Sequence, residues 1–381
     1  LLCGLCACGA AGSTAPTAGT DGAGSSATAG SFRVGYGQAN ITPDDPVPMA
    51  GYGRSDQRIS NGVINYLMAS CLAITDADDN TILLISTDLV APHDSSPHAP
   101  TLSELTGVPV ENIIMSASHT HSSPDYSVET SGSGAAVKKL RQGLIDAAVD
   151  AMEDRKPAKM YGGSIKTKGM NFVRHYLMND GTYCGDNFGS SASGYKEHAT
   201  EADAQLQLIK FTREGDKDIY LTNFQTHPHK TGGMEKYDIS ADIVGEFRDC
   251  MSAALDCDVV YFTGASGNIN PSSRITEENI TKDYREQGDK LGEHAVRILG
   301  GELTKLEGTN VQITGQFYTG EVNHSEDHLV NVAKIVQEEW KTNNDFNAAC
   351  ALANSYGLNS PYHANAVISR ANLGRTYDVE M

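Results

Sequence analysis

The chain has 381 residues, of which 39% are hydrophobic and 20% are charged, so it can bury one large core or two modest ones. Its formal net charge of −19 and its pI of about 4.9 argue against nucleic acid and anionic lipid headgroups as partners, because both bind through basic faces. The acidity also serves solubility. No apolar run reaches the roughly 18 residues that a membrane-spanning helix needs.

The first 30 residues do not have the composition of a folded segment. Residues 5–8, "LCAC", resemble a bacterial lipobox in which Cys8 is the lipidated residue, and residues 9–30 are almost all Gly, Ala, Ser and Thr. We predict a truncated lipoprotein signal and flexible tether over 1–30 and a folded domain over 31–381. This organisation favours an exported protein that an N-terminal lipid anchors to the bacterial cell surface, and a secreted protein is the alternative.

From residue 32 onward, strand patterns alternate with helix patterns. A short strand pattern opens the domain, further strands are expected at 67–75, 81–86, 112–118, 205–212, 218–226 and from 258, and helices at 135–153, 241–255, 283–299, 325–341 and 346–356. A turn around residues 78–80 joins the second and third of these strands, and a short helix precedes residue 112. A strand is also expected at 310–318, and "GRTYDVEM" reads as the opening of another. The alternation predicts an α/β fold with a mixed, mostly parallel β-sheet core and flanking helices.

Two pairs of histidines follow apolar strands. His119 and His121 lie in "IIMSASHTHSSPD", and His227 and His229 lie in "TNFQTHPHKTGG". Because residues i and i+2 of a strand share a face, each pair is expected to project together at a strand end, where α/β sheets collect ligands. Neutral imidazole suits zinc, so the pattern predicts that the four rings converge around one ion. The alternative is that they are loop histidines that only make hydrogen bonds.

Several stretches, in a fixed order along the chain, resemble the amino-terminal catalytic domain of the neutral/alkaline (non-lysosomal) ceramidase family. They are "VGYGQANITPDDPVPMAGYG", "LLISTDLV", "NIIMSASHTHSSPD", "MNFVRHY", "NFQTHPHKTGG", "ISADIVGEF" and "FTGASGNINP". Together they cover residues 34 to about 275. The ceramidase-like catalytic domain would then be 31–381, incomplete at its C-terminus.

The resemblance implies a zinc-dependent hydrolase that cleaves an amide (N-acyl) bond of a lipid or related substrate through a metal-activated water. It implies that His119 and His227 bind the metal and that His121 and Arg174 contact the substrate around the scissile carbonyl. A histidine or an arginine at that place can donate to the oxyanion that develops during attack. Arg174 could instead pair with a surface carboxylate.

The sequence departs from the family in "GNINP". Asn270 stands where the family has a serine with a catalytic role, and Asn268 stands where it has an aspartate. An amide cannot replace a hydroxyl in proton transfer, whereas a metal-bound water does not need that serine. Asn270 is therefore expected to bind the substrate instead.

The remaining metal ligands have several candidates. A catalytic zinc takes three protein ligands and a water, and the family's glutamate and tyrosine ligands come from beyond the last convincing match. His229, Asp242 and Asp88 are the candidates in this chain. Asp88 could instead orient a ligating imidazole, and Asp242 or its neighbour Ser240 could cap the helix that begins there.

Two other functions fit parts of the pattern. One is a non-catalytic surface lipoprotein that keeps the fold and metal pocket only to bind a ligand. The other is an unrelated metal-dependent hydrolase such as an amidohydrolase barrel, but a barrel places its His-x-His pair after the first strand, and here it follows several. The expected partner is a small-molecule or lipid amide, and the sequence does not indicate an oligomeric state.

Overall fold

The computed structural model describes residues 32–52, 58–126, 133–181, 183–185, 194–231, 236–275, 283–308, 310–315 and 317–380. Within these residues the chain forms two compact units. The first comprises the described parts of 32–172, 202–273 and 283–313, and the second comprises the remainder. Cys8 and the predicted tether lie outside the described residues. Among the described helices, none has the length and apolar character needed to cross a membrane.

The first unit is built on a nine-stranded sheet. Its strand order is β14-β12-β11-β6-β1-β3-β4-β5, and β16 pairs with β6. The bounds are β1 Phe32–Asn40, β3 Met68–Thr75, β4 Thr81–Thr87, β5 Ile113–Ala117, β6 Lys156–Lys166, β11 Gln205–Arg213, β12 Ile219–Phe224, β14 Asp258–Thr263 and β16 Thr304–Leu306. The mixed α/β class predicted from the sequence is confirmed.

The prediction that the sheet is mostly parallel is wrong. In the described sheet only β4–β5 and β12–β14 are parallel pairs, and the other pairings are antiparallel. Short turns join β3 to β4 and β11 to β12, and a short connection can only give an antiparallel pair. The two parallel pairs each have a helix in their connection, α1 (Ala99–Thr106) in the first and α4 (Asp242–Leu255) in the second.

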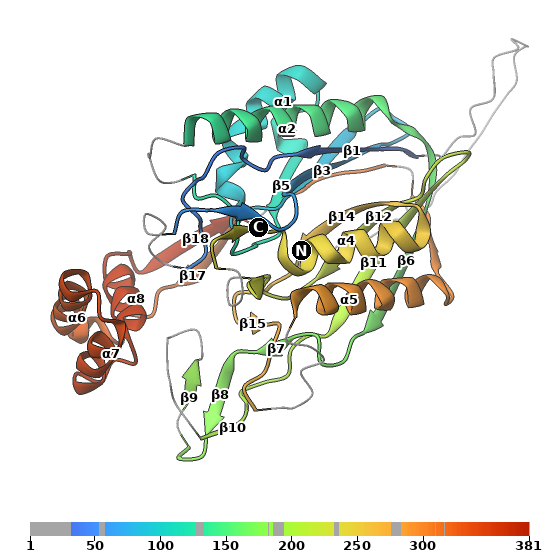
Figure 1. Ribbon diagram of the computed structural model, residues 1–381. Coiled ribbons are helices and arrows are strands. Elements are labelled where there is room, and N and C mark those ends of the chain that lie inside the picture. The colour runs from blue at the N-terminus through green and yellow to red at the C-terminus, as the bar shows by residue number, and fades with distance from the viewer. Residues whose placement is uncertain are drawn as a thin grey trace, which may run out of the picture. The chain divides into compact units, whose positions relative to one another are not determined.

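The sheet folds over on itself to make four layers. Strand β6 joins two half-sheets, the first made of β1, β3, β4 and β5 and the second of β11, β12 and β14. It pairs with β1 through residues 156–158 and with β16 through residues 160–162. Alternate residues of β1, β3 and β4 pack against alternate residues of β11, β12 and β14 in one central hydrophobic cluster. α1 and α2 (Ser133–Glu153) cover the outer face of the first half, and α4 and α5 (Tyr284–Leu299) cover that of the second (Figure 1).

Helix α2 lies very close to β1. A Cβ atom built on Gly37 would lie 2.1 Å from the carbonyl oxygen of Ala147, and one built on Gly35 would lie 2.1 Å from that of Ala151. Only glycine fits at these two positions, because any side chain would collide with the backbone of the helix. On the outer face of the second half-sheet, α4 and α5 pack on one another and present Phe247 and Leu291 to its strands.

The second unit contains a three-stranded antiparallel sheet, a pair of strands and three helices. The sheet has the order β10-β8-β9, with bounds Tyr195–His198, His175–Met178 and Tyr183–Gly185. β17 (Phe317–Glu321) pairs antiparallel with β18 (Thr376–Glu380), and α6 (Val330–Asn343), α7 (Phe346–Ser355) and α8 (Pro361–Ala371) enclose their own small core. The first unit also contains the short strands β2 (Gly62–Val63), β13 (Asp238–Ile239) and β15 (Ile269–Asn270), and β7 (Phe172–Val173) lies where the chain passes from the first unit to the second.

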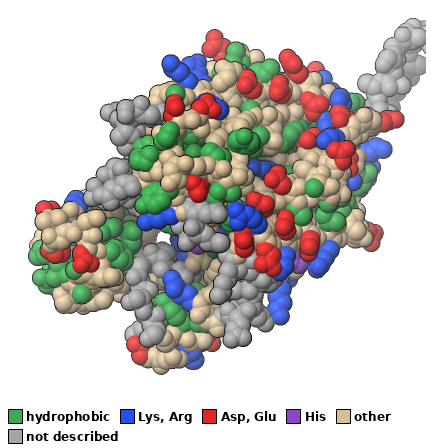
Figure 2. All heavy atoms as spheres, in the orientation of Figure 1, with side chains coloured by type: hydrophobic (Ala, Val, Ile, Leu, Met, Phe, Trp, Pro, Cys, Tyr) green, Lys and Arg blue, Asp and Glu red, His purple; other side chains and the backbone are tan. Residues whose placement is uncertain are grey.

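Most of the predicted elements are found within a few residues of their predicted ranges, whereas strand β6 and helix α8 were not predicted. The strand predicted at 310–318 is an exception, because 310–315 are irregular and β17 begins at Phe317. The strand pattern at the C-terminal end is confirmed as β18. On the face drawn in Figure 2, acidic side chains are spread widely with Lys and Arg side chains among them, in keeping with the charge of the chain.

Candidate metal centre

The carboxyl ends of the two parallel strand pairs come together at one end of the first unit. Thr263, the last residue of β14, donates from Oγ1 to the Ser118 carbonyl just after β5, over 2.7 Å. Ser86 on β4 donates from Oγ to the Tyr261 carbonyl on β14, over 2.5 Å. These bonds join the two half-sheets, so the segments that follow β5 and β12 face one another although they are about a hundred residues apart in sequence.

His119 and His227 meet at this junction. Their Nε2 atoms are 2.9 Å apart, and their ring centroids are 4.5 Å apart with the planes at 79°. His119 has a left-handed backbone with φ of 68°, a conformation that is uncommon for a residue with a Cβ and is found at functional sites. His227 is buried, at 4% exposure.

Both rings are oriented by backbone carbonyls on their far side. His119 Nδ1 lies 2.5 Å from the Val90 carbonyl oxygen, and His227 Nδ1 lies 2.8 Å from that of Ser266. A carbonyl only accepts, so both Nδ1 atoms carry the proton, and in the neutral rings both Nε2 atoms carry a lone pair. Two lone pairs 2.9 Å apart repel unless a proton or a metal ion lies between them. The arrangement is therefore that of two imidazoles prepared to bind a metal ion.

His121 brings a third ring nitrogen to the same place. Its Nε2 lies 3.3 Å from His119 Nε2, and the ligand atoms of His119, His121 and His227 all lie within 4.8 Å of one another. Two nitrogens on one tetrahedral zinc, each at 2.0–2.1 Å, are separated by about 3.3 Å. Two of the three nitrogen pairs are thus near this separation, so the three imidazoles could hold a metal ion, and a fourth position would remain for water.

His229 is close to the cluster but is directed elsewhere. Its ring centroid is 5.3 Å from that of His227 and 5.6 Å from that of His121, while its Nε2 lies 3.1 Å from Asn270 Oδ1. The group of potential metal-ligand atoms found in the described residues does not include it. The structure therefore brings together three of the four predicted imidazoles and pairs the fourth with Asn270. The Asn270 side chain is buried.

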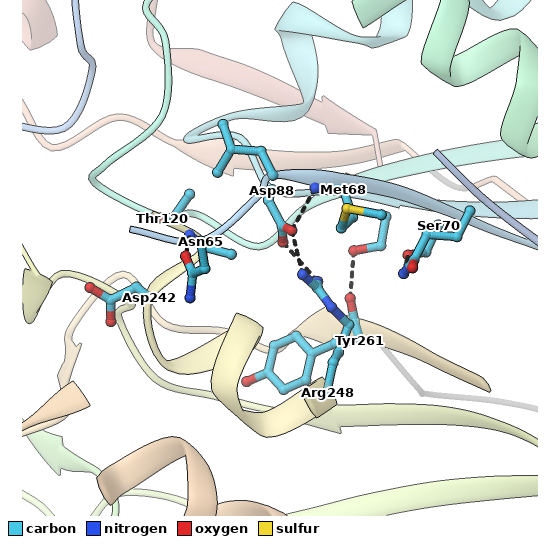
Figure 3. Close-up of polar contacts among 12 residues, drawn as sticks. Asn65, Met68, Ser70, Asp88, Thr120, Asp242, Arg248 and Tyr261 are labelled. Atoms are coloured by element: carbon cyan, nitrogen blue, oxygen red, sulfur yellow. Dashed lines mark hydrogen bonds and ion pairs between the residues drawn. The ribbon is translucent and has the colours of Figure 1, made fainter. Parts of the chain in front are cut away.

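Asp88 is engaged by an arginine and not by a histidine. Arg248 of α4 donates to both of its carboxylate oxygens, over 2.9 and 2.5 Å, and the Met68 N–H donates a third bond over 2.9 Å (Figure 3). Among the described hydrogen bonds none joins Asp88 to a histidine ring. Its connection to the site is indirect, because the carbonyls of the next two residues, Leu89 and Val90, accept from the His119 N–H and Nδ1.

Asp242 is held by the backbone where α4 begins. Its Oδ2 accepts from the Thr231 N–H and hydroxyl over 2.7 and 2.6 Å, and its Oδ1 accepts from the Ile243 N–H over 2.8 Å. Ser240 Oγ in turn accepts the Asp242 N–H over 2.9 Å. The carboxylate thus fixes the start of the helix and lies apart from Asp88 in Figure 3. The N-cap of α4 is Ala241, which makes no side-chain cap bond, so these contacts tie Thr231 to the first residue of the helix. The group of potential metal ligands among the described residues does not include Asp242.

Arg174 belongs to the second unit, whereas the histidine cluster belongs to the first. Its predicted contact with the substrate remains a prediction.

Two residues near the histidines were not singled out from the sequence. Arg58 donates to the His121 carbonyl, and Tyr52 donates from its hydroxyl to the His229 carbonyl. Backbone carbonyls leave no trace in a sequence, so neither contact could be expected from residue patterns. Gly51, with φ of 107°, is the one local signal, since it stands in a conformation that favours glycine.

No protein family model and no curated protein matches the chain. Among solved structures, it is similar to the neutral ceramidase from Pseudomonas aeruginosa, with a TM-score of 0.59 and 19% identity over 78% of this chain and 48% of that one. It is similar to the structure described as ceramidase complexed with C2 at a TM-score of 0.58 and 19% identity, over 78% of this chain and 47% of that one. The chain thus spans about half the length of these proteins. At this identity the likeness concerns the architecture, and the chain has a ceramidase-like fold.

Proposed function

We propose that the protein is a zinc-dependent hydrolase of the ceramidase-like kind, which cleaves an amide (N-acyl) bond of a lipid or related substrate. The observation that carries the proposal is the paired arrangement of His119 and His227, with each Nδ1 on a backbone carbonyl and the two Nε2 atoms 2.9 Å apart. The ceramidase-like fold supports the choice of an amide substrate.

His119, His227 and His121 would hold the ion. Imidazole nitrogens suit zinc, and three of them with one open position is a common catalytic arrangement. When bound, zinc lowers the pKa of its water toward about 7 and polarises a carbonyl that it contacts. The Val90 and Ser266 carbonyls keep two of the rings in the tautomer that binds a metal. The paired His229 and Asn270 would contact the substrate.

The resemblance in sequence assigned His121 to the substrate, whereas the distance of 3.3 Å between its Nε2 and that of His119 supports a metal ligand. Substitution of His121 by alanine separates the two roles. Loss of zinc would identify a ligand, and retention of zinc with loss of turnover would identify a substrate contact.

We also propose that the protein acts outside the cytoplasm, anchored through a lipid on Cys8. The composition of residues 1–30 supports this placement. Mass spectrometry of the protein purified from membranes of its own host would detect a lipidated Cys8, and an unmodified or cleaved N-terminus would contradict the anchor.

Metal analysis of the purified chain tests the proposed function, with His119→Ala and His227→Ala beside the wild type. His294→Ala is the matched control, because His294 lies on α5 of the same unit and outside the cluster. We expect one zinc per chain in the wild type and the control, and none in the two variants. A wild-type chain that takes up no zinc would refute the proposal.

Substrate assays then test the reaction. A fluorogenic N-acyl sphingosine should be hydrolysed in a zinc-dependent manner, in preference to a short peptide amide and an ester. Stoichiometric zinc without turnover of any of the three would instead identify a non-catalytic protein that uses the pocket to bind a ligand.

A further inference from the structure

Arg58 is a buried cation without a carboxylate partner among the described residues. Arg58 is only 3% exposed, and arginine is almost never so buried unless it is paired. Nη1 donates to the carbonyls of Ala50 and His121, each over 2.7 Å, and Nε donates to the carbonyl of Lys236 over 2.6 Å. Backbone carbonyls from three separate segments therefore balance the charge.

The segment from Ala50 to Tyr52 lies over the histidines together with this arginine. The Ala50 N–H donates to the Ser123 carbonyl over 2.9 Å, and the Tyr52 hydroxyl donates to the carbonyl of His229. The Tyr52 ring lies edge-on to the His121 ring at 5.1 Å, and the guanidinium carbon of Arg58 lies 4.8 Å from the centre of that same Tyr52 ring.

The backbone on both sides of His121 is consequently fixed. Its N–H donates to the Pro228 carbonyl over 3.0 Å, and its carbonyl accepts from Arg58. Gly51 closes off one side of the ring, since a Cβ at that position would lie 2.5 Å from the His121 Cβ. The direction of the His121 ring and its distance to the His227 segment are thus determined by contacts outside the ring itself.

We propose that Arg58 and Tyr52 are positioning residues for the metal centre, which hold the His119–His121 segment and the His227–His229 segment at the separation that one zinc ion requires. Arg58 acts on the first segment through the His121 carbonyl, and Tyr52 acts on the second through the His229 carbonyl. The inference rests on the proposed metal centre and extends it to residues that touch no metal.

The proposed positioning role requires the planar shape of the Arg58 guanidinium. Arginine presents its N–H donors in a planar fork and can reach the carbonyls of Ala50, His121 and Lys236 at once, whereas the ammonium of lysine is a compact point charge on a flexible stem. Arg58→Lys therefore keeps the charge and removes the geometry. Tyr52→Phe removes only the hydroxyl bond and retains the ring that packs on His121.

The test compares zinc affinity in the full chain, measured by competition with a chelating indicator, and the absorption spectrum of the cobalt-substituted protein, which reports ligand geometry. Arg155→Lys is the matched control. Arg155 also donates to a backbone carbonyl, that of Met152 at 2.8 Å, but it contacts Thr75 and Thr81 at the opposite end of β3 and β4.

We expect Arg58→Lys to weaken zinc binding on the order of tenfold and to alter the cobalt spectrum, because support for ligating side chains typically contributes 10–100-fold in affinity. Arg155→Lys should leave both unchanged. Wild-type affinity and spectrum in both Arg58→Lys and Tyr52→Phe would overturn the inference.

If Arg58→Lys does not fold, Tyr52→Phe decides alone, since Tyr52 is 39% exposed and its hydroxyl can be removed without opening the core. Wild-type zinc binding in Tyr52→Phe would then overturn the inference. A wild-type chain without zinc affinity overturns the metal centre and this inference together, whereas zinc binding without amide turnover overturns only the proposed activity.

Discussion

The ion pair between Asp88 and Arg248 provides the sharpest test of how the fold supports the site. The side chain of Asp88 is 1% exposed and that of Arg248 is 10% exposed. Arg248→Met removes the charge at similar volume and leaves the Asp88 carboxylate buried with one donor among the described residues, the Met68 N–H. Breaking a buried pair from one side costs about 3–5 kcal/mol, and because one donor remains we expect a loss of about 3 kcal/mol.

The double variant Asp88→Asn, Arg248→Met distinguishes the cost of losing the ion pair from the cost of burying the Asp88 carboxylate without its partner. With both charges removed, no ion remains buried without a partner, so the double variant should be more stable than Arg248→Met alone by about 1–2 kcal/mol. The free energy of unfolding is measured in urea at pH 7 by far-UV circular dichroism, with zinc chelated in every sample. Single-variant effects that add to within about 0.5 kcal/mol would refute the coupling.

Three further outcomes are expected. Gly37→Ala should lower the free energy of unfolding by about 3 kcal/mol, because the new methyl group meets the Ala147 carbonyl, and an unchanged urea midpoint would contradict the close packing of α2 on β1. Burial lowers the pKa of Lys230 from 10.5 to about 8, so between these values Lys230 binds more protons in the unfolded chain and its own contribution to stability rises with pH, by up to about 3 kcal/mol. The difference between the pH-dependent unfolding curves of the wild type and Lys230→Met should show this rise. Added zinc should raise the thermal midpoint of the wild type and leave that of His227→Ala unchanged, as seen by scanning calorimetry, and an equal rise in both would place the zinc elsewhere.

The sequence correctly predicted that histidines of the two pairs come together, but the alternation of side chains along a strand is not what brings them together. The alternation of side chains along a strand would direct His119 and His121 to one face, yet β5 ends at Ala117 and His119 has a left-handed backbone. The rings meet because a turn follows each strand. β12 likewise ends at Phe224, before His227, and the continuation through Pro228 turns His229 toward Asn270.

Long-range partners explain the other differences. Asp88 was a candidate for the metal because it follows an apolar strand, and nothing near it in sequence indicates that Arg248, on a helix that follows a different strand, takes both of its oxygens. Whether neighbouring strands run parallel or antiparallel also depends on pairings between segments that are distant in sequence. Alternating strands and helices suggested parallel neighbours, whereas β6, through antiparallel pairing with β1, β11 and β16, sets much of the observed topology.

The fold-over at β6 has a consequence for how the protein gains its metal. His119 and His121 follow one half-sheet and His227 follows the other, so neither half alone carries three imidazoles. Contacts between residues so distant along the chain form slowly, since a long loop must close before they contribute. Zinc uptake should therefore be among the last events of refolding, and its rate would report how fast the two half-sheets dock.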